Sequence, residues 1–87
     1  MEGLSRENIK VGAEFGSFWP ERINKIVMAG KNAFLVQTED VQISSLQHLV
    51  VLRISEDGLF RSFIKCDPAS FNEAIYWFNA FEKEQTK

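Results

Sequence analysis

The chain has 87 residues, of which 45% are hydrophobic and 25% are charged, a balance typical of a globular protein and not of a disordered one. This length provides for a single domain over residues 1–87 with one modest core. Twelve acidic residues against ten Lys and Arg leave a net charge of −2, which argues against a polybasic nucleic-acid-binding protein. One Cys and one His are too few for a protein-only zinc site.

The amino-terminal residues are polar and lack the continuous apolar stretch of a signal peptide. No apolar run approaches the roughly 20 residues that a membrane-spanning helix needs. The lone Cys66 cannot form an internal disulfide. We therefore expect a cytoplasmic protein without a membrane segment.

Apolar residues at period two over residues 11–15 predict a first strand. Residues 16–20, Gly-Ser-Phe-Trp-Pro, end this strand because Pro cannot donate to a β-ladder. The resulting loop carries two large aromatic side chains, Phe18 and Trp19. We expect them either to close one end of the core or to contribute to a binding surface.

Residues 22–29 and 33–38 have the β-branched and apolar composition of two further strands. Residues 30–32, Gly-Lys-Asn, tolerate positive φ and therefore favour a hairpin between them. Glu39 and Asp40 then end the second of these strands. Residues 41–48 are interpreted mostly as a loop.

The clearest hairpin joins residues 49–55 to residues 59–65 through Glu-Asp-Gly, where Gly58 favours a left-handed conformation. Pairing Ser55 with Leu59 places mostly apolar side chains on one face, which we take as the core face. The residues on that face are Val50, Leu52, Ile54, Phe60, Ser62 and Ile64.

The opposite face of this hairpin then pairs Arg53 with Arg61 and Val51 with Phe63, next to Lys65. Arg and aromatic residues are enriched in protein interfaces. The same groups could contact phosphates and bases, but three cations release few counterions. We therefore expect a protein-contact surface here in preference to a nucleic-acid surface, with a solvated outer face as the simplest alternative.

The last predicted element is an amphipathic helix, for which Asp67 is a suitable N-cap and Pro68 a suitable first residue, while Ser70 begins an overlapping capping box. Its apolar face should dock on the sheet. That face consists of Phe71, Ala74, Ile75, Phe78 and Phe81. Trp77 lies at the edge of this face and Tyr76 nearly opposite its centre, so both are candidates for contact with another molecule.

Cys66 and His48 are the one pair that could provide a nucleophile and a base. No third residue to orient them stands out, and Cys66 is expected to pack beneath the start of the helix as a small hydrophobe. We therefore expect no catalytic, metal or cofactor site, and a chain that is not an enzyme.

Together these elements predict an α+β fold: a curved antiparallel meander sheet of about five strands, with the C-terminal helix packed across its concave face. A partly open barrel is the main alternative. Within this fold a small core holds only some of the 11 aromatic residues. The remainder should be available for contacts with other molecules.

This surplus predicts a non-catalytic protein-interaction module, an accessory or regulatory protein whose partners include a second copy of itself as a homodimer. Its candidate contact residues are Phe18, Trp19, Val51, Arg53, Arg61, Phe63, Tyr76 and Trp77. The alternative is a binder of a small apolar ligand between helix and sheet, in a pocket lined by Phe18, Trp19, Phe63 and Trp77. Nucleic-acid binding through Arg53, Arg61 and Lys65 comes third.

Overall fold

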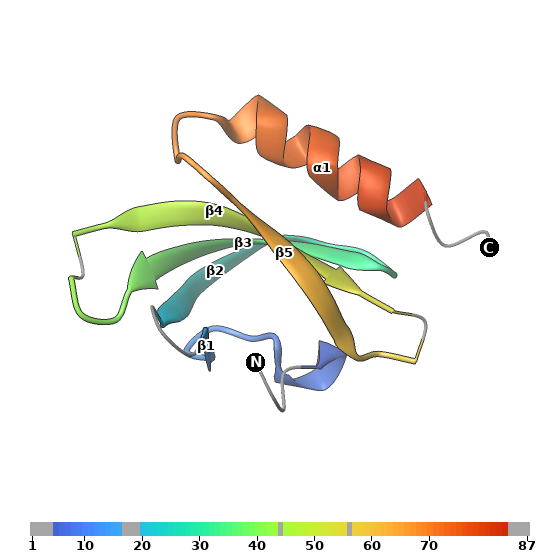
Figure 1. Cartoon of the computed structure of the whole chain (residues 1–87), viewed down its shortest axis with the longest axis horizontal. Helices are drawn as coiled ribbons and strands as arrows, with labels where there is room; N and C mark the ends of the chain where they lie inside the picture. Colours follow the sequence, from blue (N-terminus) through green and yellow to red (C-terminus); the bar gives the residue numbers. More distant parts are fainter. Residues whose placement is uncertain (1–4, 17–19, 44, 56, 84–87) are drawn as a thin grey trace.

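The described residues form one sheet of five antiparallel strands in the order β1-β2-β3-β4-β5, so strands that follow one another in sequence are neighbours in space (Figure 1). The computed structural model describes residues 5–16, 20–43, 45–55 and 57–83. The elements are η1 (Arg6–Asn8), β1 (Glu14–Phe15), β2 (Glu21–Ala29), β3 (Ala33–Asp40), β4 (Gln47–Ile54), β5 (Phe60–Cys66) and α1 (Phe71–Lys83). The predicted α+β meander with a C-terminal helix is confirmed.

The first strand is shorter than the period-two pattern predicted. The backbone N–H of Ala13 donates to the carbonyl of Lys10 over 3.0 Å, and Gly12 has a φ of +95°. Residues 10–13 therefore form a tight turn, which leaves Val11 exposed and restricts β1 to Glu14 and Phe15. Local turn formation here outweighs the alternating pattern.

The sheet curls into a half-barrel, in which an aromatic side chain of β1 contacts one of β5 although the two edge strands do not pair. The ring of Phe15 on β1 lies 5.9 Å from the ring of Phe63 on β5, in a T-shaped arrangement. This contact identifies the concave face of the sheet. The buried side chains of that face are Phe15, Ile23, Phe34, Val36, Val50, Leu52 and Ile54, with Ile9 from the amino-terminal segment packed among them.

Helix α1 packs on the other, convex face, above the sheet in Figure 1. Its buried residues, Ala74, Phe78 and Phe81, form a second cluster with side chains of opposite parity on β3, β4 and β5. The expectation that the helix crosses the concave face was therefore wrong. The concave face is already filled by its own side chains and by the amino-terminal segment, so the convex face is the one that needs a helix to bury it.

Both faces of the central strands are consequently buried. In β3, residues 33–36 are all buried, and in β4 residues 49–52 are all buried. A strand that is covered on both sides has a continuous apolar sequence instead of an alternating one. This explains the uninterrupted apolar sequence at residues 33–36 and 49–52.

A β-bulge in the last hairpin changes its register. Ile54 pairs with Phe60, as predicted, but Arg53 then pairs with Ser62, and Leu52 with Phe63. The extra residue is Arg61. The predicted pairs of Arg53 with Arg61 and of Val51 with Phe63 were therefore wrong, because one inserted residue turns every later side chain of β5 to the opposite face.

The new register has a clear benefit for packing. It pairs Val51 with Ile64 and Leu49 with Cys66, so that Ile64 and Cys66 join the cluster beneath α1. It also separates two guanidinium groups that would otherwise be direct neighbours. Both consequences favour the bulged register over the regular one.

Helix α1 begins later than predicted. The side chain of Asp67 accepts a hydrogen bond from the N–H of Ala69 over 2.8 Å, and the carbonyl of Asp67 accepts from the N–H of Ser70 over 2.8 Å. Asp67 thus closes a turn that contains Pro68. The first helical backbone bond runs from the N–H of Ala74 to the carbonyl of Ser70 over 3.1 Å, which makes Ser70 the N-cap residue.

With 13 residues, α1 is shorter than a bilayer-spanning helix, and no helix within the described ranges is long and apolar enough to cross a membrane.

Candidate functional site

The structure divides the predicted contact residues among different surfaces. Val51 is fully buried beneath α1, so it cannot contact a partner and was wrongly placed on an outer face. Phe63, on β5, lies against Phe15 and is 39% exposed. Arg61 is exposed at the bulge. The predicted residues Phe18 and Trp19 lie outside the described residues.

Arg53, in contrast, is associated with the helix. Its guanidinium carbon lies 5.6 Å from the centre of the Phe81 ring on α1, within the range of a cation–π interaction. Arg53 therefore does not share a face with Lys65, whose ammonium group lies 2.8 Å from Glu21 on the concave side. The three cations considered for nucleic-acid binding do not form one surface.

Four side chains on the convex side form a continuous series from the sheet to solvent. Arg53 covers the ring of Phe81, and the Phe81 ring lies 6.1 Å from that of Trp77. The ring of Trp77 in turn lies 5.2 Å from that of Tyr76, edge to face. Tyr76 is 64% exposed, as the helical periodicity predicted, and Trp77 is half-buried at the edge of the apolar face. We call these four residues the aromatic series.

The aromatic series ends on the outer face of α1. Within the described part of the chain this face is solvent-exposed at Glu73, Tyr76, Asn79 and Lys83 and partly exposed at Ala80. The opposite face of the helix contacts β3, β4 and β5. Tyr76 is therefore the one large aromatic side chain on a helical surface that otherwise consists, among the described residues, of Glu73, Asn79, Ala80 and Lys83.

A second group of side chains, on the concave face, was missed by the sequence analysis. Glu21 on β2 is 1% exposed, and its carboxylate accepts a hydrogen bond from the hydroxyl of Thr38 on β3. Its Oε2 lies 2.8 Å from Nζ of Lys65 on β5 and 3.2 Å from Nδ1 of His48 on β4. Four consecutive strands thus each contribute one member, and we call this group the Glu21 cluster.

The Glu21 cluster explains how a carboxylate can be buried here. One carboxylate oxygen accepts a hydrogen bond from the Thr38 hydroxyl, and the other lies 2.8 Å from the Lys65 ammonium group, so a hydroxyl donor and an opposite charge offset part of the cost of burying this carboxylate. Lys65 and His48 remain about one-third and one-quarter exposed. The cluster therefore joins four strands at one end of the concave face.

His48 and Cys66 lie on opposite faces of the sheet. His48 belongs to the Glu21 cluster, whereas Cys66 is buried beneath α1, as predicted. Burial raises the pKa of the Cys66 thiol, and the nearby negative charge of Glu73 raises it further. Since a thiolate is the reactive form, this geometry gives no nucleophile–base pair between the two residues.

The same separation affects the predicted ligand pocket. Phe63 faces the concave side with Phe15, whereas Trp77 packs on the convex side with Phe81. These two residues therefore cannot line one cavity between helix and sheet. The described part of the convex side is packed, with Ala33, Leu35 and Val51 fully buried.

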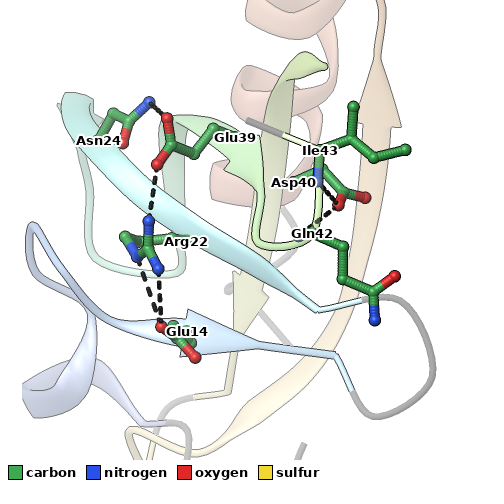
Figure 2. A network of polar contacts seen from close by, with 7 residues as sticks. All are labelled: Glu14, Arg22, Asn24, Glu39, Asp40, Gln42 and Ile43. Atoms are coloured by element: carbon green, nitrogen blue, oxygen red, sulfur yellow. Dashed lines mark hydrogen bonds and ion pairs between the residues drawn. The ribbon is translucent and has the colours of Figure 1, made fainter. Parts of the chain in front are cut away.

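The surface near β1 holds a polar ladder that links three strands. Figure 2 shows Arg22 on β2 between two carboxylates. Its guanidinium contacts Glu14 on β1 over 3.3 Å and Glu39 on β3 over 2.7 Å. Asn24 also donates to Glu39, over 3.4 Å. This ladder attaches the two-residue strand β1 to the sheet.

At the end of β3, Asp40 stabilises the following turn. Its Oδ1 accepts from the backbone N–H groups of Gln42 and Ile43 over 2.7 and 2.8 Å (Figure 2). The carboxylates of Glu14, Glu39 and Asp40 therefore all have partners that stabilise the fold. Among the residues that the structure describes, no group of three or more His, Cys, Asp or Glu side chains could hold a metal ion.

Comparisons with protein families, with curated proteins and with solved structures find no match to this chain.

Proposed function

We propose that this protein is a non-catalytic interaction module that binds a protein partner through the outer face of α1, in the cytoplasm, where its single thiol stays reduced. The observation that carries the proposal is the aromatic series, which leads from the core to the 64% exposed ring of Tyr76. Tyr, Trp and Arg are the residues that dominate binding energy in protein interfaces.

The packing of the aromatic series also favours binding. Tyr76 lies edge to face against Trp77, and Trp77 lies against Phe81, which is itself buried. An exposed aromatic ring that is already held by its neighbours loses little conformational entropy when a partner covers it. The ring of Tyr76 is therefore preorganised for binding in the free protein.

The test compares Tyr76→Ala with Arg61→Ala in an affinity-tagged chain. Tyr76→Ala removes the exposed ring, whereas Arg61→Ala changes an exposed residue at the bulge on β5. We expect Tyr76→Ala to weaken binding of associated proteins, including further copies of the chain, by about thirtyfold, which corresponds to a hot-spot residue. Arg61→Ala should bind as the unmodified chain does.

Thermal unfolding of both variants provides the control for folding, because neither side chain is buried. The proposal is wrong if Tyr76→Ala retains the same bound proteins, in the same amounts, as the unmodified chain. It is also wrong if Arg61→Ala alone causes the loss, since that result would place the binding surface on β5.

A further inference from the structure

We infer that the partner on the outer face of α1 is a second copy of this chain, bound with the two α1 helices antiparallel about a twofold axis. This inference rests on the proposed function, which it makes more specific. It follows from the order of side chains along the exposed face of the helix.

Four residues form a straight stripe on that face. Glu73, Tyr76, Ala80 and Lys83 follow one another at intervals of three, four and three residues, which is the spacing of a helix-packing seam. Tyr76 is the large member and Ala80 the small member at the centre, and opposite charges stand at the two ends. We call these four residues the α1 stripe.

An antiparallel pair of α1 stripes is complementary in both size and charge. When Tyr76 lies opposite Ala80 of the second copy, Glu73 lies opposite Lys83 of the second copy. This follows because the two helices run in opposite directions, so a residue three positions earlier on one helix faces a residue three positions later on the other. The twofold axis repeats both contacts. Each ring of Tyr76 thus meets a small side chain, and each carboxylate meets an ammonium group.

The parallel arrangement does not have this complementarity. It would place Glu73 opposite Glu73 and Lys83 opposite Lys83 of the second copy, and it would bring the two Tyr76 rings together in the centre. Like charges in direct opposition oppose association. The sequence of the α1 stripe therefore specifies the antiparallel direction.

The edge strand β5 is a weaker candidate for self-association. An antiparallel pair of β5 strands centred on Phe63 would place Arg61 opposite Lys65 of the second copy, which is a like-charge pair. The bulge at Arg61 also interrupts the regular edge that strand pairing requires. Charge complementarity thus favours α1 over β5.

The experiment uses two single charge reversals, Glu73→Lys and Lys83→Glu, and their equimolar mixture, measured by light scattering after size-exclusion chromatography. The unmodified chain should approach twice its mass of 10.0 kDa as its concentration rises. Each reversal alone makes both terminal contacts of the dimer repulsive. We expect the dissociation constant of each variant to rise by about tenfold or more.

The mixture should restore the dimer. A chain with two Lys residues in the stripe pairs with a chain that has two Glu residues, so both terminal contacts are attractive again. We expect the dissociation constant of the mixture to lie within about threefold of that of the unmodified chain. Circular dichroism controls for the effect of each reversal on the helix dipole, and that effect is the same in the mixture as in each variant alone.

The inference is overturned if the unmodified chain stays monomeric up to about 1 mM, a concentration at which even weak specific pairs form. It is also overturned if the reversals leave the mass unchanged, or if mixing does not restore association. Those results leave the proposed function standing when proteins captured by the tagged chain still depend on Tyr76. If the captured proteins do not depend on Tyr76 either, the proposed function fails as well.

Discussion

Oε2 of Glu82, in the last turn of α1, accepts a hydrogen bond from the backbone N–H of Asn32 over 2.7 Å. Its other carboxylate oxygen lies 3.2 Å from the backbone nitrogen of Lys31. The end of the helix thereby caps the turn between β2 and β3. This contact joins residues that are about 50 positions apart in sequence.

Removing this carboxylate should destabilise the fold. We expect Glu82→Ala to lower the free energy of unfolding by about 1–2 kcal/mol, because two backbone donors lose a charged acceptor. Urea denaturation measures the difference. Asn79→Ala, on the exposed face of the same helix, is the matched control and should change stability by less than about 0.5 kcal/mol. Equal losses in the two variants would contradict a capping role for Glu82.

Gly30 should depend on the same carboxylate. A Cβ atom at position 30 would collide with the carboxylate of Glu82, so we expect Gly30→Ala to destabilise the chain by displacing that side chain. In a chain that already carries Glu82→Ala, Gly30→Ala should lower the free energy of unfolding by a smaller amount. A double-mutant cycle should therefore give a coupling free energy of about 1 kcal/mol. Additive effects would show that the contact with the Glu82 carboxylate does not account for the cost of a side chain at position 30.

Glu21 should contribute more to stability than a surface carboxylate in a similar ion pair. We expect Glu21→Gln to lower the free energy of unfolding by about 2 kcal/mol, because Lys65 loses its anionic partner beside a buried amide. Glu14→Gln is the matched control, since Glu14 also pairs with a cation but its side chain is 50% exposed. Glu14→Gln should lower the free energy of unfolding by less than about 0.5 kcal/mol. Similar losses in chemical denaturation would argue against a specific role for burial.

Cys66 should make stability fall at high pH. Burial, and then the charge of Glu73, raise the pKa of the folded thiol above its ordinary value of 9.0. Above that value the unfolded chain loses the thiol proton while the folded chain keeps it. The contribution to stability is therefore present below pH 9.0 and is lost as pH rises through the higher folded value.

The measurement for Cys66 is the slope of Tm against pH in the alkaline range, compared between the unmodified chain and Cys66→Ala. The variant should have the flatter slope, whatever the effect of the missing sulfur on absolute stability. Alkylation with iodoacetamide at neutral pH should be slow in the folded chain and fast in urea. Rapid alkylation of the folded chain would contradict the burial of this thiol beneath α1.

Much of the local structure follows from the sequence alone. The hairpin between residues 49–55 and 59–65 forms where the Glu-Asp-Gly loop predicts it, with Gly58 at a φ of +87°. The amphipathic pattern wrongly places Phe71 on the buried face, since this residue is 44% exposed at the start of α1. It correctly predicts that Ala74, Phe78 and Phe81 are buried and Tyr76 exposed. These features depend on turn chemistry and side-chain periodicity within a few residues, which a sequence shows directly.

The assignment of side chains to faces, in contrast, depends on the tertiary structure. The bulge at Arg61 moves Phe63 to the concave face and Ile64 to the helix side. A period-two pattern is compatible with either register, and the total burial over both faces of the sheet decides between them. Val51 itself lies on the face predicted for it, opposite Val50 and Leu52, and is buried because α1 covers that face.

The Glu21 cluster could not be predicted for the same reason. Its members come from four strands and are separated by up to 44 positions, from Glu21 to Lys65. No local spacing in the sequence indicates that they meet. By itself the sequence therefore determined the strands, the hairpins and the amphipathic helix, because these depend on neighbours along the chain. The curl of the sheet, the face covered by α1 and the partners of Glu21 were decided by the tertiary structure, since they depend on burial summed over the whole fold.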